Sequence, residues 1–195
     1  MLHRFIFDLK RDFSQYTFTE SILKGQHLFI YDTSNLTEMI DNEPATRHFK
    51  IMQSDPENEV VHICIDGDFI PKHDSQSLAF FGIRPDCLVF DKNKFICLEL
   101  KVEQEDATWE KEDSKWKKFF EGARQILAFI KYLRVNQFEV KNYYSTLYGI
   151  ICMRFEPNFS INNKSNAQRN VQLFKISTEL SFEIKPHNHL HDFLF

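Results

Sequence analysis

The stretch Arg84–Lys101, which reads RPDCLVFDKNKFICLELK, decides the fold of this chain. Residues 87–90 are apolar and β-prone, residues 91–94 are polar, and residues 95–100 are apolar again. Two short apolar runs on either side of a polar turn predict a β-hairpin. The remaining elements of the sequence are interpreted outward from this hairpin.

Charged residues occupy positions on the hairpin where dry side chains are expected. Side chains alternate along a strand, so Glu99 and Lys101 share one face with Phe95 and Cys97. Because burial of a lone charge is costly, a carboxylate and an ammonium at the end of an apolar strand indicate mutual pairing, a bound metal, or both. Asp86, on the partner strand, can add a second carboxylate to the same corner.

The sequence Pro85-Asp86, followed thirteen residues after the aspartate by Glu99-Leu100-Lys101, resembles the PD-(D/E)xK motif of restriction-endonuclease-like phosphodiesterases. The resemblance implies that Asp86 and Glu99 are catalytic metal ligands for one or two Mg²⁺ or Mn²⁺ ions. It further implies that Leu100 offers its backbone carbonyl to the metal. Lys101 would be the catalytic lysine that positions or activates the attacking water.

Phosphodiester hydrolysis requires these residue types independently of the resemblance. The reaction needs a nucleophile made from water and neutralisation of charge on the phosphate, which hard cations on carboxylate oxygens supply together. A lysine beside the metal adds a positive donor for the same transition state. The structural alternative is an ordinary salt bridge between Glu99 and Lys101, with Asp86 beginning a turn after proline.

An amphipathic helix is predicted over residues 113–134, where apolar residues recur at 3.6-residue spacing. Lys117, Lys118 and Arg124 lie around its polar side and are interpreted as candidate nucleic-acid-binding residues, with solubilising charge as the alternative. The resemblance implies that a Gln or Lys on this helix points toward the active site. Gln125 is the position we expect, and an exposed helix residue is the alternative.

Further elements are predicted on both sides of this core. Helical spacing is found over residues 5–13, and strands are expected over residues 28–31, 59–65, 144–155, 171–176 and 180–184. A short helix from Thr33 or Ser34 to Ile40 would carry Glu38, a candidate for the additional glutamate that many members of the family place upstream. Glu20, Glu43 and Glu59 are equal candidates, and a solvated helix face is the alternative for each. The tail, residues 186–195, is interpreted as a terminal surface segment.

Composition sets the wider expectations. The chain has 195 residues, of which 43% are hydrophobic, a length and composition typical of one well-packed domain spanning residues 1–195 with its core at about 59–155. No apolar run has transmembrane length and no signal pattern precedes the first charges, so a cytoplasmic protein without membrane contact is expected.

Four cysteines without a CxxC pair indicate reduced core thiols. The net charge of −4 does not favour nucleic-acid binding, but local basic patches govern such binding more than the total does.

The resemblance and the order of the elements together predict an α/β chain with a mixed sheet, more closely α+β. We expect the restriction-endonuclease-like αβββαβ core, a central mixed sheet flanked by helices. The expected function is a divalent-metal-dependent nuclease, with DNA favoured over RNA as the nucleic-acid partner and a homodimer as a further option. A non-catalytic nucleic-acid- or protein-binding module on the same fold is the alternative. An unrelated fold with an accidental motif would be indicated if Asp86 and Glu99 lay far apart.

Overall fold

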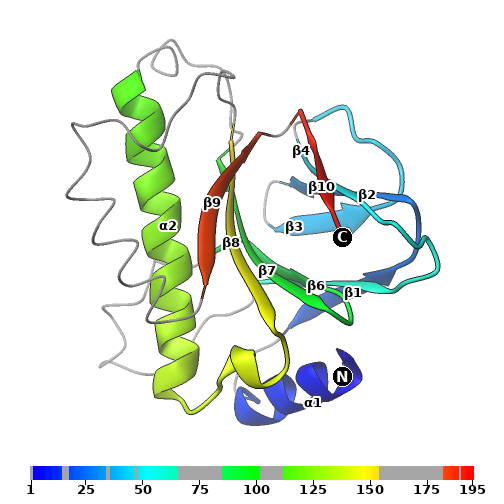
Figure 1. Ribbon diagram of the computed structural model, residues 1–195, viewed down its shortest axis with the longest axis vertical. Helices are drawn as coiled ribbons and strands as arrows, with labels where there is room; N and C mark the ends of the chain where they lie inside the picture. The colour runs from blue at the N-terminus through cyan, green and yellow to red at the C-terminus, as the bar shows by residue number, and fades with distance from the viewer. Residues whose placement is uncertain are drawn as a thin grey trace.

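Two β-sheets lie face to face, and helices cover the outer face of the larger one (Figure 1). The computed structural model describes residues 2–14, 18–33, 36–46, 48–65, 85–101, 112–153, 182–188 and 190–195, including their side chains except at 112–116. The mixed α/β composition that the sequence predicts is confirmed. None of the helices in these ranges is long and apolar enough to cross a membrane.

The larger sheet has six strands, and its spatial order places the predicted hairpin at its centre. In that order the strands are β1 (Thr19–Leu23), β5 (Val60–Cys64), β6 (Cys87–Phe90), β7 (Lys94–Lys101), β8 (Thr146–Met153) and β9 (Glu183–Asn188). Strands β1, β5, β6 and β7 pair antiparallel, whereas β8 and β9 continue the sheet in parallel from β7.

The smaller sheet has four strands and packs on the other face of the six-stranded sheet. Its order is β10 (Asp192–Leu194), β4 (His48–Met52), β2 (His27–Asp32) and β3 (Thr37–Ile40). Strand β4 alternates between buried apolar and less buried residues: Phe49 and Ile51 are fully buried while Lys50 between them is not. A strand with one apolar face must bury it against a second layer, and the six-stranded sheet provides that layer.

The central hairpin forms as the sequence predicts. Cys87 pairs with Leu98 and Phe90 pairs with Phe95, so β6 and β7 are in direct antiparallel register. The Asp91 carboxylate accepts backbone hydrogen bonds from Asn93 at 2.7 Å and from Lys94 at 2.6 Å, which closes the turn. The polar tetrapeptide between the two apolar runs is therefore a turn fixed by its own first side chain.

Helix α2 (Glu112–Val135) connects β7 to β8 and lies along the outer face of the six-stranded sheet (Figure 1). This connection is a helical crossover that brings two parallel strands side by side. Its apolar side packs into the core cluster that contains Phe119, Ala123, Ile126 and Leu133. A short 3-10 helix η3 (Val140–Asn142) follows before β8 begins.

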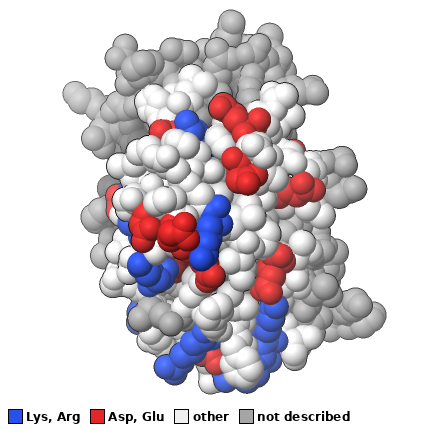
Figure 2. Space-filling view, turned by 90° about the vertical axis from the view of Figure 1, so that its right-hand side faces the viewer, with Lys and Arg blue, Asp and Glu red and all other residues white. Residues whose placement is uncertain are grey.

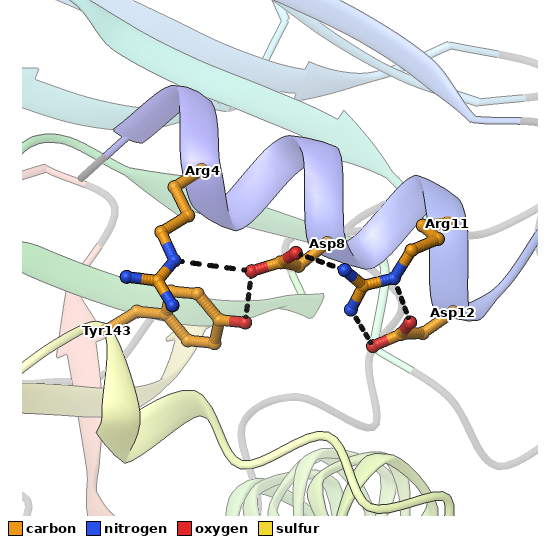
Figure 3. Close-up of polar contacts among 5 residues, drawn as sticks. All are labelled: Arg4, Asp8, Arg11, Asp12 and Tyr143. Carbon is orange, nitrogen blue, oxygen red and sulfur yellow. Dashed lines mark hydrogen bonds and ion pairs between the residues drawn. The ribbon is translucent and has the colours of Figure 1, made fainter.

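Helix α1 (Leu2–Asp12) covers the same face of the six-stranded sheet, beside α2. A polar network fixes it to the chain just after η3 (Figure 3). The buried Asp8 accepts a hydrogen bond from the Tyr143 hydroxyl at 2.7 Å, and Arg11 lies 2.9 Å from the other Asp8 oxygen. Burial and the bond to Asp8 raise the pKa of Tyr143 to about 12, so the hydroxyl remains a donor at neutral pH.

Two expectations about the flanks of the chain are wrong. The segment Thr37–Ile40, expected to end a helix, forms strand β3, and before it the Thr33 hydroxyl donates to the Leu36 carbonyl at 2.7 Å. The tail is not a surface segment, because Phe193 and Phe195 are buried and β10 pairs in parallel with β4. Aromatic residues near the C-terminus complete the core between the sheets.

The expected layering is also corrected. Helices were expected to flank the central sheet, but in the described residues the helices cover one face and the four-stranded sheet covers the other. The four cysteines are buried and form no disulfide, as expected. The predicted strand at 171–176, and the part of the 180–184 strand that precedes residue 182, lie outside the described residues.

Candidate functional site

The candidate site lies where β6 begins and β7 approaches its end. The hairpin register of Cys87 with Leu98 brings Asp86 opposite Glu99 on the neighbouring strand. The backbone N–H of Asp86 donates to the Leu98 carbonyl at 3.1 Å, and its side-chain oxygen Oδ2 accepts the backbone N–H of Leu100. At this end of the hairpin the Asp86 carboxylate, rather than a backbone carbonyl, therefore accepts the hydrogen bond from the Leu100 N–H.

Glu99 and Lys101 share one face of β7, as the alternation predicts. The Glu99 side chain is only 1% exposed, whereas that of Lys101 is 24% exposed and reaches toward solvent. Lys101 Nζ and Glu99 Oε1 form a close ion pair. A carboxylate this deeply buried is tolerated because a positive charge accompanies it.

The two carboxylates are electrostatically coupled. Burial raises the pKa of Asp86 well above its ordinary value, and the neighbouring Glu99 charge raises it further. The hydrogen bond from the Leu100 N–H and the charge of Lys101 act in the opposite direction and do not cancel the increase. The structure thus brings Asp86, Glu99 and Lys101 together, in surroundings that disfavour a second negative charge on Asp86.

The backbone of Leu100 completes the arrangement. Its N–H points toward Asp86, and the N–H and C=O of one strand residue point to the same side of the strand. The Leu100 carbonyl therefore faces the side of β7 on which Asp86 lies. The Leu100 side chain, 3% exposed, packs into the core between the two sheets and takes no part in the polar site.

This donor set fits a hard divalent cation. Carboxylate and carbonyl oxygens are the ligands that Mg²⁺ and Mn²⁺ prefer, and a cation beside Asp86 and Glu99 would offset the repulsion between them. Among the described residues there is no group of three or more metal-ligating side chains. A metal here would accordingly be held by Asp86, Glu99 and the Leu100 carbonyl, with water completing its coordination.

Helix α2 touches the site through a glycine. A Cβ built on Gly122 would lie 3.1 Å from Cγ of Glu99 and 3.0 Å from a side-chain carbon of Ile151. Only a residue without a side chain lets the helix approach β7 so closely. Gln125, three residues further along, is half-buried and lies on the same side of the helix as Gly122.

The three basic residues predicted to bind nucleic acid do not lie together. Lys117 and Arg124 are exposed, on the side of α2 that faces away from the sheet, whereas Lys118 is half-buried near the Gly122 side. The sequence alone could not separate these lysines, because the boundary of the buried stripe falls between adjacent residues. Of the three, Lys118 is therefore the one nearest the sheet-facing side of the helix.

Glu38, considered as an additional ligand, lies on β3 with its side chain exposed. It accepts a hydrogen bond from the Tyr31 hydroxyl at 2.9 Å, on the outer side of the four-stranded sheet. Two other candidates have partners elsewhere: Glu20 accepts from Lys10 at 2.8 Å, and Glu43 lies 3.7 Å from His48.

The acidic residue that the structure does bring near the pair is Asp32, which the sequence reasoning did not consider. It pairs directly with Thr37, so both side chains lie on one side of the smaller sheet. That side faces the larger sheet, because the Thr37 hydroxyl lies 3.0 Å from Nε2 of His62 on β5. The Asp32 charge raises the pKa of both Asp86 and Cys152. The sequence offered one signal for this: Asp32 follows Leu28 and Ile30 at two-residue spacing, so all three lie on the same face of β2.

Charges of both signs are mixed over the face turned to the viewer in Figure 2, the side of the four-stranded sheet in Figure 1. The lysine and arginine side chains drawn there form no continuous basic area, and acidic side chains lie between them. An extended nucleic-acid track would require such an area. This face therefore does not add a binding surface to the candidate site.

The chain matches no protein-family model, no curated protein and no solved structure. The interpretation of the site therefore depends on its geometry and chemistry.

Proposed function

We propose that the protein is a divalent-metal-dependent nuclease that hydrolyses phosphodiester bonds, with DNA favoured over RNA. The observation that carries the proposal is the pair Asp86 and Glu99, which share one corner of the sheet with Lys101 beside them. Structural ion pairs need one carboxylate for each cation. A second, half-buried carboxylate, whose pKa is raised by desolvation and by the charge of the first, is better explained by a bound cation.

In this proposal each residue has a distinct role. Asp86 and Glu99 hold Mg²⁺ or Mn²⁺ together with the Leu100 carbonyl, and the ion supplies Lewis-acid stabilisation of the phosphate and lowers the pKa of a bound water. Lys101, partly exposed beside Glu99, donates to the phosphate or orients the water. Asp86 also fixes the end of the hairpin through the Leu100 N–H, which keeps the ligands in place.

The order of the elements supports the restriction-endonuclease-like part of the proposal. Helix α1, strands β5, β6 and β7, helix α2 and strand β8 follow one another as αβββαβ, with β1–β4 inserted after α1. The four strands of this series are adjacent in the six-stranded sheet. The four-stranded sheet on the opposite face is an addition to the expected core.

Cleavage of supercoiled plasmid, and of labelled single-stranded DNA and RNA, with Mn²⁺, Mg²⁺ or EDTA tests the proposal. We expect metal-dependent cutting by the wild type and a loss of at least about a hundredfold in Asp86→Asn, Glu99→Gln and Lys101→Met. Glu38→Gln is the matched control and should cut normally, because its carboxylate lies elsewhere.

Two results would overturn or redirect the proposal. Cutting that survives in all three site variants would indicate a contaminating activity. A folded wild type that binds nucleic acid and cuts none of the substrates with any metal would support the alternative, a non-catalytic binding module.

A further inference from the structure

The register between α2 and the sheet places Lys118 at the level of Lys101. Gly122 contacts Glu99 of β7 and Ile151 of β8, which fixes one point of this register. Ile126 follows Gly122 by four residues in the helix, and Gly149 precedes Ile151 by two residues in β8. A Cβ built on Gly149 would lie 3.0 Å from Cγ2 of Ile126. The helix therefore runs antiparallel to β7 and β8.

The same register between α2 and β7 can be followed one helical turn toward the N-terminus of α2. Four helical residues rise about 6 Å and two strand residues rise about 6.6 Å, so one helical turn matches two strand residues. Lys118 is four residues before Gly122, and Lys101 is two residues after Glu99. The two lysines consequently lie at the same height, at the end of the sheet beyond the carboxylate pair.

The side of α2 that carries Lys118 faces the β6 part of the sheet. Lys118, Gln125 and Tyr132 recur at seven-residue steps and lie on one flank of the helix. The Tyr132 ring lies 5.9 Å from that of Phe13, which follows α1. Helix α1 in turn packs on β6, where the Phe5 and Phe90 rings are 4.9 Å apart. The flank with Lys118 is thus turned toward the side on which Asp86 lies.

We infer that Lys118 is a substrate-binding residue that holds the phosphate backbone from the helix side, opposite Lys101. The inference rests on the proposed function and deepens it. A phosphodiester at the site has a cation on each flank, Lys101 from the strand and Lys118 from the helix. Lys118 is half-buried on the flank of α2 turned toward β6, whereas Lys117 beside it is exposed on the opposite side of the helix. The ligand class is therefore a polyanionic nucleic-acid strand.

Neighbouring lysines provide a matched experiment. Binding of short fluorescein-labelled DNA in Mn²⁺ is measured by anisotropy over a series of salt concentrations for wild type, Lys118→Met, Lys118→Arg and Lys117→Met. Methionine keeps most of the side-chain stem, and an unchanged melting temperature establishes that each variant is folded. Single-turnover cleavage by the same proteins gives a second readout.

The logarithm of the binding constant falls linearly with the logarithm of the salt concentration. Loss of one phosphate contact lowers the magnitude of that slope by about one and weakens binding about tenfold at ~0.1 M salt. We expect this change in Lys118→Met, recovery in Lys118→Arg, and binding within about twofold of wild type in Lys117→Met. Equal effects of the two methionine variants, or none, would overturn the role of Lys118 while wild-type cutting upholds the nuclease. A wild type that neither binds nor cuts would overturn both.

Discussion

The folded protein disfavours ionisation of the Asp86 carboxyl group. Its pKa is raised in the folded state, so the folded protein holds a proton there that the unfolded chain has already released. The stability that this proton contributes is present below the ordinary pKa of 3.8 and is lost as the pH rises through the raised value. The free energy of unfolding therefore falls as the pH rises above 3.8, which is expected of a carboxylate that the fold places beside a second one.

Replacement of Asp86 by Asn should consequently stabilise the metal-free protein at pH 7.5. An Asn oxygen can still accept the Leu100 N–H, so the substitution removes the charge and retains the hydrogen bond. We expect an increase of about 1 kcal/mol, or ~2–4 °C in the melting temperature. The difference should shrink as the pH is lowered toward the ordinary pKa of 3.8, where the unfolded chain also binds the proton. A lower melting temperature for the variant at pH 7.5 would contradict the assignment.

His62 has the opposite pH dependence. It is 2% exposed between the two sheets, where its ring lies 3.0 Å from the Thr37 hydroxyl and 3.4 Å from the Ser21 hydroxyl. Burial lowers its pKa from 6.5 to about 4. The unfolded chain therefore binds a proton that the folded protein does not, and stability falls as the pH drops from 6.5 toward 4.

The expected loss between those two pH values is about 3 kcal/mol, measured by urea unfolding at a series of pH values. His62→Gln should be less stable than the wild type at pH 7 and should lack this part of the pH dependence. If the variant retained the full dependence, the loss would have to originate at other groups.

At the scale of elements, the contact between α2 and β7 depends on Gly122. The neighbouring Ile151 and Glu99 are almost fully buried, so neither can move aside readily. Gly122→Val should destabilise the protein by about 2–3 kcal/mol through overpacking. Arg124→Val, on the exposed side of the same helix, controls for the poorer helix propensity of valine and should cost only about 0.5 kcal/mol. If urea unfolding gave equal losses of stability for Gly122→Val and Arg124→Val, the close approach of α2 to β7 would be unimportant.

Local patterns were sufficient for the elements that build the site. The apolar runs at 87–90 and 95–100, the polar turn and the helical stripe after residue 112 each specify their structure within a short window. The same patterns placed Glu99 and Lys101 on one face, as the structure has them. A helix was expected to begin at Thr33 or Ser34, but the Thr33 hydroxyl bonds the Leu36 carbonyl before β3, because a threonine hydroxyl can begin a helix or close a turn.

The second sheet depends on contacts that no short window contains. Strand β10 pairs with β4, about 140 residues earlier in the chain. The apolar residues of β2 and β4 are buried only because the larger sheet packs against them, and no short stretch of sequence shows that contact. For the same reason Asp32 was overlooked: it approaches Asp86 from a different sheet. The separation of Lys117 from Lys118 likewise needed the orientation of α2 against β7.

At the scale of the whole molecule, the candidate site lies in the layer shared by two cores. One apolar cluster joins the larger sheet to α1 and α2, and the other joins it to the four-stranded sheet. Glu99 belongs to the helix side, Leu100 packs toward the second sheet, and Asp86 lies at the end of the hairpin between them. Ligands positioned by packing on both sides of one sheet are held more rigidly than ligands on a loop.

Isothermal titration of Mn²⁺ into the metal-free protein at pH 7.5 tests most directly whether this corner is a metal site. The wild type should bind Mn²⁺ saturably, Glu99→Gln should lose that binding, and Glu38→Gln should retain it. Mn²⁺ at ~100 times its dissociation constant should also stabilise the wild type by about 2.7 kcal/mol. Absence of binding by the wild type, or equal binding by Glu99→Gln, would contradict the assignment of Asp86 and Glu99 as metal ligands.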